Sequence, residues 1–440
     1  MFARTAGILL LLFFTTTVCA NPEIQHWQTE KGAGVYFVEA HELPMVDIQV
    51  IFDAGSSRDT GKPGLAALTG NLLAEGAAGL SADAVSRNFE NLGAIYGHDT
   101  GNDFALISLR SMSDPEKLTP ALKNFKQVVL RPDFSQDAFK RQRNRTLIAI
   151  RQKQQSPGEL ARDAFYAAIF GDHPYAAPVE GTEESLQRIA TEDVIAFHKK
   201  YYVAGNAIIA IVGDLDRARA ENLANDLAGE MIQGEKAPPL PEVSALTAAK
   251  TITIHHPSTQ THILVGQPGV KRLDPDYFPL YVGNYILGGG SMVSRLFEEI
   301  REKRGLSYSA YSYFLPMRQP GPFVAGLQTR TDQAQEALQL LREQLRLFVE
   351  KGPTGAELVA AKKNITGSFP LRIDSNSNIA GYLGVIGFYG LPLDYLDTFT
   401  KKVESVTVEQ IKDAFKRRLS PDKVVVVTVG PENNNAGDKN

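Results

Sequence analysis

The chain repeats one pattern of predicted helix and strand, and this repeat constrains the fold more than any single residue does. In the first copy, a helical pattern at 192–202 is followed by an apolar strand at 207–212 and then by a glycine. In the second copy, a helical pattern at 409–419 is followed by an apolar strand at 424–429 and again by a glycine. The start and the end of the repeat are both displaced by 217 positions (192 to 409, and 213 to 430). The chain is therefore predicted to contain two copies of one structural unit.

Earlier parts of the two copies also correspond. Gly70-Asn71 lies in a helical pattern, and Gly283-Asn284 lies in another, 213 positions later. Each copy begins with two strand-like runs and continues with long helical patterns. These segments are 35–38, 46–52 and 137–154 in the first copy, and 251–255, 262–265 and 333–349 in the second. The order indicates an α+β fold with two homologous domains, each a mixed β-sheet with helices packed on one face.

A segment rich in glycine and proline, 232–246, is typical of an exposed linker. It is predicted to separate an N-terminal domain, 24–231, from a C-terminal domain, 247–432, with a flexible tail at 433–440. The first twenty residues, 1–20, are predicted to be a signal peptide for export to the periplasm.

That prediction depends on three features. Arg4 is positively charged, 7–14 is apolar but too short to span a bilayer, and Val18-Cys19-Ala20 resembles a cleavage site. A lipid anchor on Cys19 is the alternative, but Val18 is large for the residue before a lipoprotein cysteine. Because Cys19 is the only cysteine, cleavage after Ala20 would exclude disulfides, thiolate metal sites and cysteine nucleophiles.

The composition excludes two classes of partner. A formal net charge of −4 without a basic run argues against nucleic-acid binding. No second apolar stretch approaches the length of a membrane span, so no integral membrane segment is expected.

The second copy carries the most specific motif of the sequence. It contains Leu287-Gly288-Gly289-Gly290-Ser291, followed from Ser294 to Tyr308 by SRLFEEIREKRGLSY. This run resembles the C-terminal-domain signature of the pitrilysin/insulinase family of zinc metallopeptidases, which includes mitochondrial processing peptidase. The duplicated plan, the linker and the chain length also fit that family over roughly the whole of 24–432. The resemblance implies a processing-peptidase-like fold.

In that family, two histidines of an H-x-x-E-H motif and a distal glutamate bind zinc, and the glutamate of the motif is the general base. By alignment, Ala67, Gly70 and Asn71 take the places of His, Glu and His in this chain. The distal glutamate falls near Ile148 or Ala149, neither of which has a carboxylate. The resemblance therefore implies that this chain binds no metal of its own and is not a peptidase alone.

The histidines offer no replacement site. His255, His256 and His262 are the closest group in the sequence. Neighbouring strand positions point to opposite faces, and Pro257 interrupts the strand, so these three are predicted to be polar residues at strand ends.

The resemblance assigns Arg301 and Tyr308 to substrate binding and transition-state stabilisation, because the family's arginine–tyrosine pair binds the scissile carbonyl at the zinc site of the opposite half. The alternative is a solvated helix face at 298–304, with Glu299 and Lys303 paired. Gly288, Gly289 and Gly290 correspond to a loop that touches substrate in the processing peptidases. The alternative for these glycines is ordinary helix termination.

Two functional hypotheses follow from the resemblance. In the first, the chain is the metal-free, substrate-binding subunit of a heterodimeric periplasmic peptidase, and a homologous H-x-x-E-H subunit supplies zinc. In the second, it is a non-catalytic scaffold or a peptide-binding assembly protein of the same fold. Peptides or unfolded polypeptides are the expected ligands, added as a strand to a sheet edge near His98 to Leu109. No Ser/His/Asp set or carboxylate pair supports a stand-alone peptidase.

Overall fold

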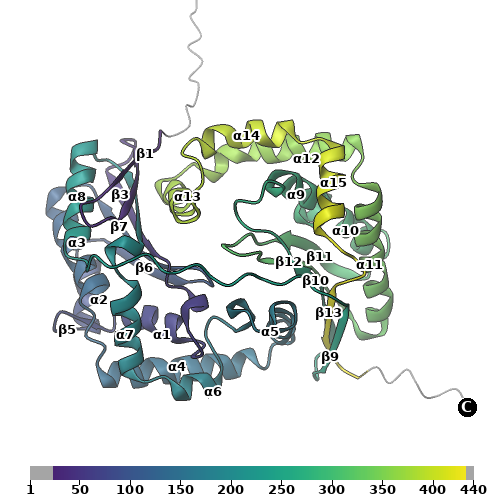
Figure 1. Ribbon diagram of the computed structural model, residues 1–440, viewed down its shortest axis with the longest axis horizontal. Coiled ribbons are helices and arrows are strands. Elements are labelled where there is room, and N and C mark those ends of the chain that lie inside the picture. The colour runs from purple at the N-terminus through teal and green to yellow at the C-terminus, as the bar shows by residue number, and fades with distance from the viewer. Residues whose placement is uncertain (1–22, 433–440) are drawn as a thin grey trace, which may run out of the picture.

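The structure is a computed structural model that describes residues 23–432 (Figure 1). The predicted signal peptide, with Cys19, and the predicted tail 433–440 lie outside the described residues. Two halves, each with one large sheet and its own helices, lie side by side and are joined by an extended segment. Among helices in the described part, none has both the length and the apolar character needed to cross a membrane.

The N-terminal half contains a six-stranded mixed sheet in the order β1-β2-β8-β3-β7-β6. β2 and β8 are parallel, whereas the other neighbours are antiparallel. The strands are β1 Gln25–Gln28, β2 Gly34–Glu39, β3 Met45–Phe52, β6 Ile95–Thr100, β7 Ala105–Met112 and β8 Ala207–Gly213, with a small ribbon of β4 Gly76–Ala77 and β5 Leu80–Ser81.

Five helices of this half, α2, α3, α4, α6 and α8, begin at a residue whose side chain caps the helix. In α3, Asp114 accepts a hydrogen bond from the Glu116 backbone N–H, and Pro115 occupies the first turn. The apolar positions of α3 recur at helical spacing and are buried against β7. The helices are α1 Leu65–Leu72, α2 Ala82–Glu90, α3 Pro115–Leu130, α4 Gln136–Lys153, α5 Pro157–Phe170, α6 Glu183–Arg188, α7 Thr191–Tyr201 and α8 Arg217–Gly229.

The C-terminal half follows the same plan with a five-stranded sheet in the order β11-β12-β10-β13-β9, in which β13 and β9 are parallel. The strands are β9 Lys250–His255, β10 Gln260–Pro268, β11 Ser307–Phe314, β12 Pro322–Arg330 and β13 Val425–Gly430. The helices are α9 Tyr277–Asn284, α10 Arg295–Phe297, α11 Ala334–Lys351, α12 Gly355–Ser368, α13 Asn376–Tyr389, α14 Tyr395–Ser405 and α15 Val408–Arg418, with π-helical turns at Tyr285–Gly289 and Glu298–Glu302.

The two sheets have equivalent strand orders, which confirms the predicted α+β duplication. Read from the parallel pair, β2-β8-β3-β7-β6 in one half corresponds to β9-β13-β10-β12-β11 in the other. The sequence repeat forms α7 and β8 in the first half and α15 and β13 in the second. β6 and β11 are therefore equivalent edge strands.

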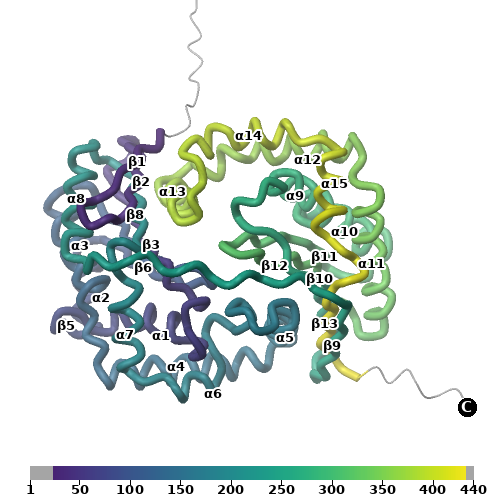
Figure 2. Tube along the Cα trace, in the orientation of Figure 1, coloured from purple at the N-terminus to yellow at the C-terminus, as the bar shows by residue number. Residues whose placement is uncertain are grey.

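One helix of each half covers the sheet of the other half. α5 packs on β10 and β13 of the C-terminal sheet, and α13 packs on β8 and β3 of the N-terminal sheet (Figure 2). The sequence predicted helices on only one face of each sheet, which is correct for the helices of the same half. It did not predict that a helix of the other half covers the opposite face of the sheet. This is why most residues of β3 are buried on both faces.

Glycines permit these close helix–sheet contacts. A Cβ at Gly387 of α13 would lie 2.5 Å from the Tyr36 ring and 2.6 Å from Ile208 Cγ2. A Cβ at Gly266 of β10 would lie 2.9 Å from the Phe165 ring of α5. The absence of a side chain at these positions lets helix and sheet approach across the boundary between the halves.

A buried carboxylate also joins the halves. Asp103, only 2% exposed, accepts hydrogen bonds from the Tyr175 hydroxyl in the N-terminal half and, in the C-terminal half, from the Tyr389 hydroxyl at 3.1 Å and the Arg318 backbone N–H at 2.8 Å. The connecting segment passes nearby, since the Gln319 side-chain amide donates to the Leu240 carbonyl at 3.3 Å. No regular helix or strand lies between Gly229 and Lys250.

Candidate functional site

α1 is the helix that should hold the zinc ligands if the chain had them. Its first turn is fixed by the buried Asp59 carboxylate, which accepts from the backbone N–H groups of Gly64 at 2.7 Å and Ala66 at 2.8 Å. Ala67 and Gly70 are buried in α1, and Asn71 is half-buried. Only Asn71 of these three residues presents a polar side-chain atom.

Edge strand β6 covers the face of α1 where the ligands would stand. Asn71 Oδ1 accepts a hydrogen bond from His98 Nε2 at 3.0 Å, and burial lowers the pKa of the His98 imidazole. A Cβ at Gly70 would lie only 2.9 Å from Thr100 Oγ1. A glutamate at position 70 would therefore require the Thr100 side chain to move.

The position of the distal zinc-binding glutamate also lacks a metal ligand. α4 packs on α1, but Ile148, which falls at the aligned position on α4, is 56% exposed and carries no ligand atom. Glu75, which follows α1, is bound by two arginines of α4, Arg141 at 3.0 Å and Arg145 at 3.1 Å. Throughout residues 23–432, no three His, Cys, Asp or Glu side chains form a group able to hold a metal ion. The residues present do not fit a zinc ion at this site.

The equivalent site in the C-terminal half is built from α9 and β11. Asn284, the counterpart of Asn71, donates from Nδ2 to the Ser312 carbonyl at 2.9 Å and accepts from the Ser312 hydroxyl at 2.8 Å. In both halves, an asparagine on the first long helix therefore binds the edge strand. Sequence reasoning identified the asparagine repeat but not its partners, because His98 and Ser312 lie far from it along the chain.

A groove of about 680 Å³ opens beside this second site. It is lined by aromatic side chains of α9 and β11, among them Tyr281, Tyr311 and Tyr308, and by Gly288 and Gly289. A Cβ at Gly288 would lie 2.4 Å from the Ser312 backbone nitrogen. Gly288 is thus required for packing against β11, whereas a Cβ at Gly289 or Gly290 would instead lie 2.7 Å from Asn284 Nδ2 or from the Tyr285 carbonyl oxygen.

Arg301 and Tyr308 are brought together at the rim of this groove. The Arg301 guanidinium carbon lies 4.7 Å from the Phe297 ring centre and 6.0 Å from that of Tyr308. Tyr308 is 88% exposed. The two side chains lie in the C-terminal half, and α1 lies in the N-terminal half (Figure 1).

The charged run around Arg301 separates into two groups. Lys303 pairs with Glu299 at 2.6 Å, as the helix-face alternative predicted, and Arg304 pairs with the same carboxylate at 2.8 Å. In the described chain, Arg301 has no carboxylate within ion-pair distance. The segment 298–304 therefore contains both the ion-paired helix face and Arg301, whose guanidinium group is not used in an ion pair within the described residues.

The predicted substrate edge needs one correction. His98 lies in β6, which is the outermost strand of its sheet, but Ala105 to Leu109 lie in β7, which is bonded to β6 on one side and to β3 on the other. Within the predicted range, only 98–100 therefore lies on an edge strand that can accept an added strand. The histidines near β9 and β10 form no metal-binding group either.

Both halves of the chain match known proteins of one family. A family profile described as "Insulinase (Peptidase family M16)" matches residues 35–183, and one described as "Peptidase M16 inactive domain" matches residues 188–365. A crystal structure titled as a peptidase M16 inactive domain from Pseudomonas fluorescens is 42% identical, covers 93% of this chain and 98% of its own, and superposes with a TM-score of 0.90. This chain belongs to the insulinase family, peptidase family M16.

Two further comparisons concern proteins of Helicobacter pylori, one by sequence and one by fold alone. The "Non-peptidase homolog YmxG" of Helicobacter pylori is 29% identical over 387 residues, which cover 87% of this chain and 88% of that protein. The structure of a protease from Helicobacter pylori shares the fold at a TM-score of 0.86, with 19% identity over 93% of this chain and all of the other. The chain is thus an insulinase-family protein whose zinc site lacks its ligands.

Proposed function

We propose that this chain is the metal-free subunit of a heterodimeric periplasmic zinc peptidase that degrades peptides. In this proposal, a homologous subunit with an intact H-x-x-E-H motif supplies the zinc ion and the general base. This chain supplies Arg301 and Tyr308 and one half of the substrate chamber. The observation that carries the proposal is an asymmetry: α1 lacks every ligand, whereas Arg301 and Tyr308 lie together at the rim of an open groove.

The two side chains suit the stabilisation of an oxyanion. Arginine keeps its charge and carries several fixed N–H donors, and the tyrosine hydroxyl adds another donor. With no carboxylate bound to Arg301 and with Tyr308 exposed, both can turn to a carbonyl oxygen presented by a partner. One such donor contributes about 2.7–4 kcal/mol to transition-state stabilisation.

Peptide binding is supported by two further features. β6 and β11 each lie at one edge of their sheet, and their outer backbone groups can add a peptide strand. The tyrosines of the groove beside β11 offer amphipathic surfaces for side chains of a peptide. The expected substrates are therefore peptides or unfolded polypeptides rather than folded proteins.

The test uses the purified chain alone and combined with a homologue that carries an intact H-x-x-E-H motif. We expect neither zinc nor peptide cleavage in the chain alone. In the complex, Arg301→Ala and Tyr308→Phe should each lower kcat by about 10²–10³. Arg304→Ala is the matched control, because Arg304 is bound to Glu299 in the same segment, and this variant should retain activity.

The scaffold function is the second candidate, and the similarity to the non-peptidase homologue of Helicobacter pylori favours it. It predicts that Arg301→Ala and Tyr308→Phe leave the function of the complex unchanged, while substitutions at the subunit interface abolish assembly. Stoichiometric zinc in the lone chain, together with cleavage that is insensitive to Arg301→Ala, would refute both candidates.

A further inference from the structure

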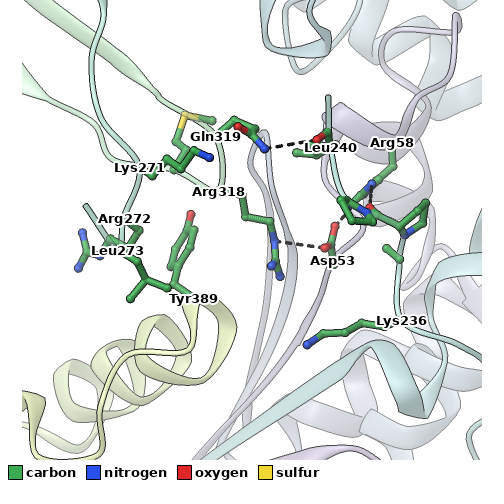
Figure 3. Close-up of a pocket in the computed structure, with 14 residues that line it drawn as sticks. Asp53, Arg58, Lys236, Leu240, Lys271, Arg272, Leu273, Arg318, Gln319 and Tyr389 are labelled. Atoms are coloured by element: carbon green, nitrogen blue, oxygen red, sulfur yellow. Dashed lines mark hydrogen bonds and ion pairs between the residues drawn. The ribbon is translucent and has the colours of Figure 1, made fainter. Parts of the chain in front are cut away.

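A cavity of about 370 Å³ lies between the two halves, beside the connecting segment (Figure 3). The N-terminal half contributes Asp53 and Arg58, the connecting segment contributes 236–240, and the C-terminal half contributes 271–273 and 317–319. Arg272 also lines the groove that carries Tyr308, whereas the other residues of the cavity do not. The cavity therefore adjoins that groove at Arg272, but Arg301 and Tyr308 are not part of its lining.

The cavity wall is strongly cationic. Its only carboxylate is Asp53, which is 4% exposed and is bound by two arginines, with Arg58 Nε at 2.7 Å and Arg318 Nε at 3.1 Å. The lining also includes Lys236, Lys271 and Arg272. Asp53 is therefore occupied by two guanidinium groups and cannot compensate these three cations.

The three remaining cations have no carboxylate within ion-pair distance in the part of the chain that the structure describes. Lys236 and Lys271 extend into the cavity from opposite walls, with Arg318 between them (Figure 3). Arg272 lies at the edge, with its guanidinium carbon 6.0 Å from the Tyr389 ring centre. Both lysines are exposed, so a ligand can reach them.

The clustered positive charges of this cavity favour the binding of an anion. Like charges gathered at a partly enclosed site repel one another, and the low-dielectric walls strengthen the field at its centre. The repulsion is relieved when an anion enters. Guanidinium and ammonium groups together match the oxygens of phosphates and carboxylates, which can accept several charge-assisted hydrogen bonds at once.

We propose that this cavity binds a small oxyanion with two or more negative charges, held by Lys236, Lys271 and Arg318 and flanked by Arg272. Because Lys236 belongs to the connecting segment and Lys271 to the C-terminal half, the bound anion ties the segment to that half. Phosphate esters and polycarboxylates share the required chemistry, and the experiment distinguishes them.

The experiment measures binding of inorganic pyrophosphate and, separately, of citrate to the full chain by isothermal titration calorimetry. We expect one saturable site for at least one probe. Pyrophosphate binding would identify phosphates as the ligand class, and citrate binding would identify polycarboxylates. Hydrogen exchange at the backbone amides of 236–240, which are those of Lys236, Ala237 and Leu240, should slow in the presence of the probe that binds.

Variants locate the site. Lys271→Gln combined with Lys236→Gln should weaken binding about 100-fold, since each charge-assisted contact is worth about tenfold. Lys363→Gln is the matched control, because Lys363 is an exposed lysine of α12 outside the cavity, and it should leave the affinity unchanged. Both lysines are exposed, so the double variant should fold, and an unchanged circular dichroism spectrum checks this.

The proposal is overturned if neither probe binds saturably, or if the double variant binds as tightly as the control. It is also overturned if the exchange rate at 236–240 does not respond to a bound probe.

Discussion

Replacing Gly387 by valine tests whether α13 stabilises the N-terminal sheet from the opposite half. A Cβ at this position would lie 2.5 Å from the Tyr36 ring and 2.6 Å from Ile208 Cγ2, well inside van der Waals contact. The two methyl groups of valine extend the overlap, so helix or sheet must shift. Overpacking of this kind costs about 1–3 kcal/mol, and the gain in helix propensity over glycine returns only about 0.4 kcal/mol. We expect a net loss of about 2 kcal/mol in the free energy of unfolding.

The same helix supplies the control. A Cβ at Gly381 would meet no atom within 4 Å, so Gly381→Val should change the free energy of unfolding by no more than about 0.5 kcal/mol. Urea unfolding followed by tryptophan fluorescence would measure both variants, since Trp27 lies in β1 of the sheet that α13 covers. Hydrogen exchange in β8 should quicken in the Gly387 variant alone. Equal stability of the two variants would show that α13 does not pack on this sheet in solution.

Two further predictions concern buried groups. Asp103→Ala leaves three donors without their acceptor and should lower the free energy of unfolding, measured in thermal scans, by about 3 kcal/mol or more. The control is Asp332→Ala at an exposed ion pair, which should cost less than about 1 kcal/mol in the same measurement. Equal losses in the two variants would contradict the role of Asp103. Burial lowers the pKa of His198, whose Nε2 donates to the Val129 carbonyl, to about 4. The unfolded chain, with a histidine pKa of about 6.5, therefore binds more protons between these values, and stability should fall as pH decreases from about 6.5 to about 4. His198→Gln should flatten that decline in urea titrations at several pH values, and an unchanged slope would exclude His198 as its cause.

Local patterns and the repeat predicted much of the fold. The displacement of 217 positions located α7 with β8 and α15 with β13, because an amphipathic helix and an apolar strand each leave a periodic signature. The loss of the zinc site was also visible in the sequence, because two of the ligand positions and the general-base position, Ala67, Asn71 and Gly70, lie within five residues of one helix. The glycine-to-tyrosine run led to Arg301 and Tyr308, whose role remains a prediction, although the structure brings them together.

Features that depend on distant segments left no local signature. The positions of α5 and α13 on the opposite sheets depend on the tertiary arrangement, because an amphipathic helix does not encode which sheet it covers. Asn71 and His98 meet only because β6 folds over α1. The cationic cavity gathers Lys236, Lys271 and Arg318 from separate parts of the chain, and their individual charges look ordinary in the sequence. Spacing alone cannot reveal such contacts.

Because α5 and α13 each pack on the sheet of the other half, neither sheet can be fully covered until both halves have been synthesised. The N-terminal half leaves the ribosome first, yet one face of its sheet waits for residues 376–389, which emerge some 160 positions after β8. Until then Tyr36, Val38 and Val212 have no apolar partner from the later half. A nascent or truncated chain that stops before α13 therefore exposes these apolar side chains, to which chaperones can bind and through which chains can aggregate. In the complete chain, α13 covers this face of the sheet.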